Sequence, residues 1–266
     1  MIDAHVHFWG GRLDWMTEGM AVLHRALGPE ELRPSLAANG IDRIVVVQTQ
    51  SSLEETRRFL ALAETSDLVA GVVGWVDLTA PDVAAALAEL CESPGLVGIR
   101  HQVHDEPDPT WLLRDDVRRG LRAVQDAGLA YDLLVRPREL PAALEVARAF
   151  PELRLVIDHA AKPPVASGEL EPWAGRMAPF AELEHVSCKV SGLVTEANWE
   201  RWSAADLVPY VSRLAAWFGP ERLLFGSDWP VCLLAASYDE VVAAYGDALG
   251  GLAQPSAAAE RTYRLP

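Results

Sequence analysis

Two histidines stand one residue apart near the start of the chain, in the run IDAHVHFW at residues 2–9. Side chains two residues apart share one face of a β-strand at a spacing of about 6–7 Å, so the imidazoles of His5 and His7 are predicted to point the same way. Asp3 is expected on the same face, in a column with both histidines. Such a pair could bind a metal ion, bind a substrate, or form a hydrogen-bonded pair in the core.

A third histidine and a carboxylate occur at the ends of later apolar runs. His159 lies in VIDHAAKPP and Asp228 in LLFGSDWPVC. With His5 and His7 they form a set of nitrogen and oxygen donors that suits a divalent ion such as zinc, and the carboxylate can also accept a proton from an attacking water. The same groups could work without metal, the imidazoles donating hydrogen bonds to a carbonyl while Asp228 acts as base. The residues alone leave both alternatives open.

Cationic side chains accompany these groups. Arg100, in GIRHQVHDEPDP, could clamp a carboxylate or hydroxyls with its planar fork, or form an ion pair at the rim with Asp105 or Glu106. Lys162 follows His159 in a loop stiffened by proline and could bind an anionic or hydroxylated substrate or be solvated. His104 is expected to be a loop residue rather than part of a site.

One further charged pair is predicted inside the fold. Lys189, in SCKVSG, shares a face with Ser187 and Ser191 by strand alternation, and Asp132 lies at a similar depth two strands earlier. An unpaired buried charge is costly, so an internal ion pair of Lys189 with Asp132 is one interpretation and substrate contact is the other.

Several of the nine tryptophans stand near the ends of apolar runs or in the loops that follow. They could form flat walls for a ring-shaped ligand, or serve ordinary packing. The residues concerned are Trp9, Trp75, Trp111, Trp199 and Trp229.

The elements that must position these residues alternate along the chain. Eight short apolar or β-branched runs are predicted as strands, at 2–7, 43–48, 70–76, 96–101, 130–135, 154–159, 186–191 and 222–227. Helical patterns lie between them, at 53–65, 81–91, 114–127, 139–149 and 203–218. Parallel strands need such crossovers, and the 266 residues match the roughly 250 of one barrel, so the fold class predicted is α/β, a single-domain (β/α)8 TIM barrel over residues 1–266. A doubly wound open sheet is the competitor, but the first run lacks its glycine-rich phosphate turn.

In such a barrel the reactive groups gather at the carboxyl ends of the strands and in the loops that follow. Nearly every predicted strand ends in a polar or aromatic group, and the loops at 8–30 and 102–112 are expected to cover an open mouth in part. The alanine-rich tail from Gly250 onward is predicted to form a weak last helix with a frayed end.

Composition excludes several classes of protein. Half of the residues are hydrophobic, which excludes global disorder, and the net charge of −15 argues against nucleic acid as a partner. Three cysteines without C-x-x-C spacing indicate neither a disulfide framework nor a thiolate metal site, which fits the cytoplasm. Neither a secretion signal nor a membrane span is expected, since no 18 apolar residues run unbroken.

Five segments together resemble the amidohydrolase superfamily of metal-dependent hydrolases: IDAHVHFW, GIRHQVHDEPDP, VIDHAAKPP, CKVSGLVTEANW and LLFGSDWPVC. Within it they are similar to the group of sugar lactonases that act on L-fuconolactone and L-rhamnonolactone and to the pyrone dicarboxylate lactonases. The resemblance spans residues 2 to about 245. It implies a core of His5, His7, His159 and Asp228, with Asp228 as general base. Many members carry a bridging Lys or Glu on the fourth strand and a His on the fifth; their absence here implies one zinc ion at most, or no metal.

The resemblance implies hydrolysis of a lactone, an aldonolactone above all, in carbohydrate metabolism. Asp228 would activate water, while a divalent ion or the histidines stabilise the oxyanion. The expected substrate-binding residues are Arg100, His101, Lys162, Gln48, Trp75 and Trp229. The partner would be a small molecule, with the protein a monomer or homodimer. A metal-dependent decarboxylase acting on an aromatic or unsaturated acid and a non-catalytic ligand-binding barrel are the rival interpretations.

Overall fold

The computed structural model describes residues 1–249 and 255–265. Eight parallel strands form one sheet in the order β1 to β8, which confirms the predicted barrel. The strands are β1 Ile2–Val6, β2 Arg43–Val47, β3 Val69–Gly74, β4 Leu96–His101, β5 Ala130–Leu133, β6 Leu155–Ile157, β7 Val186–Val190 and β8 Leu223–Phe225. A bridge between Val6 and Trp229, and a hydrogen bond of 2.7 Å from His7 N to the carbonyl of Trp229, join the first strand to the segment after the last.

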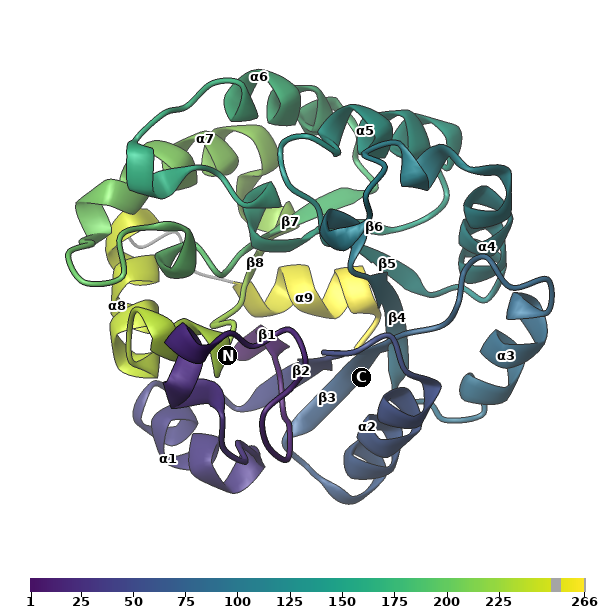
Figure 1. Ribbon diagram of the computed structural model, residues 1–266, viewed down its shortest axis with the longest axis horizontal. Coiled ribbons are helices and arrows are strands. Elements are labelled where there is room, and N and C mark those ends of the chain that lie inside the picture. The colour runs from purple at the N-terminus through teal and green to yellow at the C-terminus, as the bar shows by residue number, and fades with distance from the viewer. Residues whose placement is uncertain (250–254, 266) are drawn as a thin grey trace.

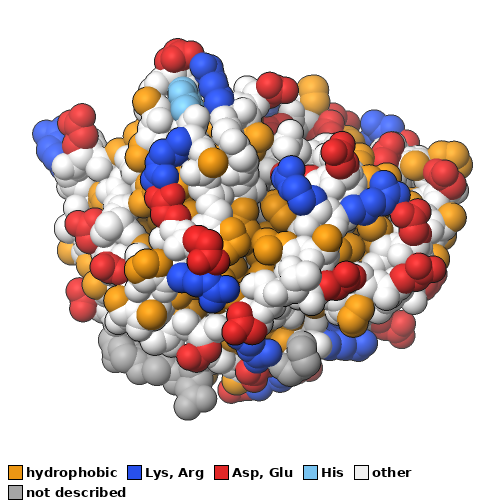
Figure 2. Space-filling view, turned by 90° about the horizontal axis from the view of Figure 1, so that it is seen from below, with side chains coloured by type: hydrophobic (Ala, Val, Ile, Leu, Met, Phe, Trp, Pro, Cys, Tyr) orange, Lys and Arg blue, Asp and Glu red, His pale blue; other side chains and the backbone are white. Residues whose placement is uncertain are grey.

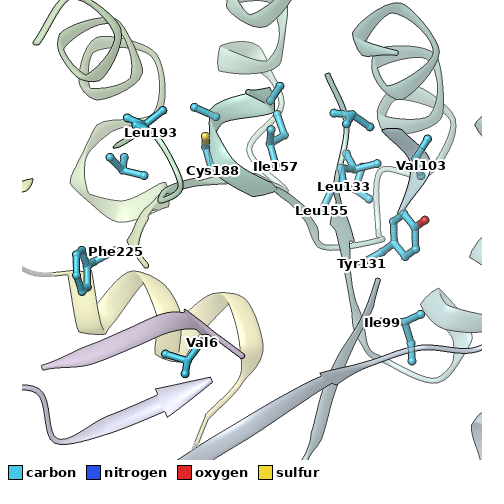
Figure 3. Packing of buried hydrophobic residues seen from close by; sticks show 14 of the residues in the cluster. Val6, Ile99, Val103, Tyr131, Leu133, Leu155, Ile157, Cys188, Leu193 and Phe225 are labelled. Atoms are coloured by element: carbon cyan, nitrogen blue, oxygen red, sulfur yellow. The ribbon is translucent and has the colours of Figure 1, made fainter. Parts of the chain in front are cut away.

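Helices surround this ring of strands (Figure 1). They are α1 Pro29–Ala38, α2 Leu53–Thr65, α3 Val83–Leu90, α4 Asp115–Asp126, α5 Leu140–Ala149, α6 Trp173–Met177, α7 Ala204–Arg222 and α8 Tyr238–Leu249. The five predicted helices all occur, with ends that shift by a few residues. The outward faces of the strands pack against the helices in a large apolar layer, in which Ile99, Tyr131, Leu155, Ile157 and Phe225 lie buried (Figure 3).

A ninth helix, α9 Pro255–Tyr263, crosses the centre of the ring of strands (Figure 1). Ala258, Ala259 and Tyr263 are buried against inward-facing residues near the strand starts, and Ser256 Oγ accepts a hydrogen bond of 3.1 Å from Ile2 N. The predicted last helix is therefore present, and its small alanines let it pack closely against the base of the barrel. The frayed end stays a prediction. Residues 250–254 and 266 of that tail lie outside the described residues.

The described surface is mixed in charge. On the face seen in Figure 2, Lys and Arg side chains are interspersed with Asp and Glu and do not gather into a basic patch. Among the described residues, no helix combines the length and the apolar character that crossing a membrane requires. The three cysteines, Cys91, Cys188 and Cys232, are free thiols.

Candidate active site

The two histidines of β1 reach the barrel interior because the strand carries an irregularity. The pairing with β2 shifts register between Asp3 and Val6, as in a β-bulge. Ala4 therefore belongs to the inner core, and His5, the next residue, also contacts interior groups. Asp3 instead accepts hydrogen bonds from Ser227 N at 2.9 Å and from the hydroxyl of Tyr238 on α8 at 3.0 Å. The prediction that Asp3 shares the inner face with the two histidines is therefore wrong. Its carboxylate instead connects β1 to the segment after β8 and to α8.

The chain after β6 bends sharply. The strand ends at Ile157 rather than at the predicted residue 159, and the four residues from His159 to Lys162 all have φ between 51° and 59°. Such left-handed backbone costs about 1 kcal/mol or more for each non-glycine residue. The turn is held by a hydrogen bond of 2.7 Å from Trp173 Nε1 to the carbonyl of Ala160. It lets Asp158 and His159 both face the interior, although neighbours in a strand would point to opposite sides.

Two glycines bring neighbouring backbone close to the histidines. A Cβ on Gly226, just after β8, would lie 2.6 Å from Cβ of His5, so only glycine fits at this position without a shift of the neighbouring strand. A Cβ on Gly192, just after β7, would lie 2.7 Å from Nδ1 of His159, and Gly192 has φ of +61°. Asp228 follows Gly226 by two residues and also has a positive φ, 58°. The glycines of the segments SGL at 191–193 and FGSD at 225–228 thus allow the backbone after β7 and β8 to approach the histidines closely.

His5, His7, His159 and Asp228 meet at one point in the barrel. Nε2 of His5 lies 3.1 Å from Nε2 of His7, and Asp228 Oδ1 lies 3.3 Å from His7 Nε2, 3.8 Å from His5 Nε2 and 4.0 Å from His159 Nε2. All four residues are almost completely buried. The convergence predicted from the strand ends is therefore present, while the roles of the four residues stay predictions.

The chemistry of this donor set fits a divalent ion. His7 Nδ1 lies 2.8 Å from the carbonyl oxygen of Val47, which can only accept, so Nδ1 carries a proton and Nε2 of the neutral ring is an acceptor. That acceptor faces the Asp228 carboxylate at 3.3 Å, and two acceptors this close need a proton or a cation between them. His5, His7 and Asp228 offer one ligand atom each within 4.8 Å of one another, two nitrogens and one oxygen, as zinc prefers.

Electrostatics set the protonation states at this point. Burial raises the pKa of Asp228, but the imidazoles of His159 and His7 outweigh burial and hold that pKa below its ordinary value. Burial lowers the pKa of His159 well below its ordinary value, and burial together with the charge of Lys189 does the same for His5. At neutral pH the site therefore presents an ionised carboxylate beside neutral imidazoles, the state required of a base or of metal ligands.

A buried ion cluster supports His5 from below. Lys189 Nζ lies 2.6 Å from Asp132 Oδ2, 3.0 Å from Asp158 Oδ1 and 3.0 Å from His5 Nδ1, so it pairs with two buried carboxylates directly beside the His5 ring. The Tyr263 hydroxyl from α9 donates to Asp132 at 2.8 Å. The predicted pair of Lys189 with Asp132 is confirmed, and it links the C-terminal helix to the histidine column.

The predicted face of β7 is also present. Ser187 Oγ lies 3.1 Å from Thr262 Oγ1 of α9, Lys189 meets His5, and Ser191 Oγ lies 2.8 Å from His159 Nδ1. The three alternate residues therefore face the barrel interior at successive depths, from α9 at one end of the barrel to His159 at the other.

A cavity of about 440 Å³ opens above the four central residues. His7, Arg100, His159 and Asp228 line its floor. The loops above supply Trp15, Met20, Thr49, Gln102, His104, Asp105, Leu134, Arg136, Lys162, Thr195, Glu196, Trp199, Val231 and Leu234. The loops at 8–30 and 102–112 both contribute, as expected from the sequence.

The expected substrate-binding residues divide into two sets. Arg100 and Lys162 line the cavity. Arg100 does not form the rim ion pair considered above; it pairs with buried Asp158 at 3.0 Å and donates to the carbonyl of Gln48. Lys162 pairs with Glu196 at 2.8 Å.

The other four expected binding residues are absent from the cavity lining and contact neighbouring side chains. Gln48 Nε2 donates to the Arg100 carbonyl at 3.2 Å, and Trp229 packs on Phe8. His101 Nε2 lies 2.7 Å from Glu106, and its Nδ1 accepts a hydrogen bond of 3.1 Å from Trp75 Nε1. Any role of these four in binding substrate stays a prediction.

Several lining residues were not expected from the sequence. His104 was placed in a loop, and it does lie in one, but it also lines the cavity with Nδ1 buried and without a hydrogen-bond partner among the described residues. Trp15 was also not expected, because alternating helix and strand patterns carry no signal for such a loop residue. Trp199, one of the five tryptophans predicted as possible walls for a ring-shaped ligand, does line the cavity, whereas Trp9, Trp75, Trp111 and Trp229 do not.

Comparisons with known proteins give one consistent result. The family model described as amidohydrolase matches residues 2–260. An L-fucono-1,5-lactonase from Burkholderia ambifaria is 44% identical over 245 residues, covering 90% of this chain and 83% of that protein. An L-fucono-1,5-lactonase from Burkholderia multivorans is 40% identical, covering 100% and 96%. A crystal structure of an amidohydrolase from Burkholderia multivorans with bound zinc superposes with a TM-score of 0.94 at 39% identity, covering 100% of this chain and 99% of that one.

Proposed function

This chain belongs to the amidohydrolase family, and on that premise we propose that it is a hydrolase that opens the ring of a sugar aldonolactone related to L-fucono-1,5-lactone. The observation that carries the proposal is the buried Asp228 carboxylate, with its pKa held below the ordinary value, beside His5, His7 and His159 at the floor of a cavity large enough for a monosaccharide ring. Two relatives of this chain, at 44% and 40% identity over most of its length, are L-fucono-1,5-lactonases. The decarboxylase alternative is therefore less supported.

In the proposed mechanism, Asp228 removes a proton from a water molecule as the water attacks the lactone carbonyl. Negative charge then develops on the carbonyl oxygen, and Arg100 and the histidines of the floor supply positive charge and hydrogen bonds to it. When the bond from the carbonyl carbon to the ring oxygen breaks, the proton on Asp228 passes to that oxygen, which becomes a hydroxyl. The product is the ring-opened hydroxy acid, which loses a proton to solvent at neutral pH.

His5, His7 and Asp228 would hold one divalent ion, with His159 beside it. Such an ion, zinc being the candidate, would polarise the carbonyl as a Lewis acid. The zinc-bound relative and the donor set support this proposal. Lys162 and Arg136, at the cavity wall, would bind ring hydroxyls. We further propose that residues 1–266 form one barrel domain and that it acts in the cytoplasm, which the three free cysteines support.

A lactone panel tests the proposal. Purified protein is incubated with aldono-1,5- and 1,4-lactones, and proton release is followed with a pH indicator against the uncatalysed rate. Metal content is measured on the same preparation before and after chelation. We expect rapid acidification with at least one 1,5-lactone. No turnover of any lactone, together with carbon dioxide release from an aromatic acid, would refute the lactonase proposal in favour of the decarboxylase.

A further inference from the structure

The walls of the cavity differ in chemistry from one side to the other. Trp15 and Met20 come from the segment after β1, Trp199 from the segment after β7, and Val231 and Leu234 from the short helical segment after β8. The strands β7, β8 and β1 are neighbours around the barrel (Figure 1), so the segments that carry these five side chains follow one another on one side of the cavity, and we call the five side chains the apolar wall.

The other wall is polar and is built from the segments after β2, β4, β5 and β6. Its members are Thr49, Gln102, His104, Asp105, Arg136 and Lys162, with Leu134 as an apolar exception. The cavity therefore accepts a ligand that has one hydroxylated edge and one apolar edge.

Two polar side chains also line the cavity from the β7 side, and both are engaged elsewhere. Thr195 Oγ1 donates to the carbonyl of Gly192 at 2.8 Å, and Glu196 pairs with Lys162 at 2.8 Å. The Thr195 hydroxyl proton is therefore taken by the Gly192 carbonyl, and Lys162 holds the Glu196 carboxylate toward the polar side of the cavity.

The covalent structure of an aldono-1,5-lactone matches this asymmetry once the carbonyl lies beside Asp228. One arm of the ring leaves the carbonyl through C2 and C3 and carries hydroxyls. The other arm leaves through the ring oxygen to C5, which carries the C6 group. When the hydroxyls of the first arm face the polar wall, the C6 group on the second arm faces the apolar wall.

We propose that Val231 and Leu234 form the subsite for C6 and select 6-deoxy-aldonolactones, whose C6 is a methyl group, against hexonolactones, whose C6 carries a hydroxyl. This inference rests on the proposed function and adds its specificity-determining residues. Both side chains are partly buried and follow Asp228 within six residues, so the same segment positions the base and the C6 subsite. A C6 hydroxyl placed there loses water without gaining a partner, whereas a methyl group gains apolar contact.

The test compares two lactones that differ only at C6. L-Fucono-1,5-lactone and L-galactono-1,5-lactone share their stereochemistry at C2 to C5, and the second carries the extra hydroxyl. We expect wild type to prefer the first by roughly 10- to 100-fold in kcat/KM. The variants Val231→Thr, which keeps the side-chain shape, and Leu234→Asn should each reduce this ratio at least fivefold. Val22→Thr makes the same change on an exposed side chain outside the cavity lining and should leave the ratio unchanged.

The outcomes separate the two proposals. If wild type hydrolyses neither this pair nor any lactone of the panel, the proposed function fails and this inference with it. If wild type hydrolyses both lactones with similar kcat/KM, or if both cavity variants fold, as shown by an unchanged circular dichroism spectrum, and keep the wild-type ratio, the C6 subsite is refuted while the lactonase function stands. A ratio that falls equally in Val22→Thr also refutes it, since the effect would not come from the cavity.

Discussion

Replacing Asp228 by Asn tests the base at the centre of the mechanism. The change keeps the size of the side chain and removes its charge and its ability to take a proton. The structure predicts that the variant folds, since an Asn amide can donate to Nε2 of His7, which lies 3.3 Å from Asp228 Oδ1 and acts as an acceptor in the neutral ring. A lost general base costs about 10²- to 10⁴-fold in rate. We therefore expect kcat to fall at least 100-fold with a small change in KM.

The same cavity supplies a matched control. Asp105 also lines it, but its side chain lies beside His104 at 3.2 Å rather than among the central histidines. Asp105→Asn should therefore change kcat by only a few fold. The assay is proton release from L-fucono-1,5-lactone, corrected for the uncatalysed rate, with metal content measured on wild type and both variants. If folded Asp228→Asn keeps kcat within tenfold of wild type, or if Asp105→Asn loses as much, Asp228 is not the base and the mechanism is wrong.

Three further changes probe the elements around the site. Gly192→Ala should lower kcat at least tenfold, because the new Cβ would lie 2.7 Å from Nδ1 of His159 and displace the ring; wild-type kinetics in a folded variant would contradict this. Lys189→Met should lower the free energy of unfolding in urea by about 3–5 kcal/mol, since buried Asp132 loses its cationic partner and Asp158 keeps only Arg100, and a loss below 1 kcal/mol would show that the cluster is not an ion pair. Burial and nearby cations lower the pKa of His104 to about 3, so below pH 6.5 the unfolded chain binds a proton that the folded protein does not, and the folded state loses stability. Between pH 7 and 5 the free energy of unfolding of wild type should fall by about 2 kcal/mol more than that of His104→Gln. Equal losses in the two proteins would refute the lowered pKa.

The parts of the fold that follow from local pattern were predictable from the sequence. The eight strands are short apolar runs, and each predicted helix has an apolar face that the barrel buries. Parallel strands in a closed barrel bring their carboxyl ends together, so His5, His7, His159 and Asp228 could be grouped although the first and the last of them lie more than 220 residues apart in sequence.

What escaped prediction depends on contacts between distant segments. Asp3 left the predicted face because a bulge in β1 lets its carboxylate reach Ser227 N and the Tyr238 hydroxyl, and strand alternation holds no information about a bulge. The alanine-rich tail was predicted to be weak because it is a terminal segment, and its own pattern carries no signal of what it packs against. Ala258, Ala259 and Tyr263 are buried against inward-facing residues of the strands, a contact between segments far apart in sequence.

Asp158 gives the clearest physical reason for such a miss. It precedes His159, so a regular strand would point the two side chains apart, and only the left-handed turn from His159 to Lys162 turns both inward. That conformation is unfavourable for non-glycine residues in isolation, and no local pattern of residues would predict it. It persists because Asp158 gains Arg100 and Lys189 at 3.0 Å each, contacts that exist only after the barrel has closed. The strain and the buried ion cluster thus depend on each other, and both place His159 at the floor of the cavity.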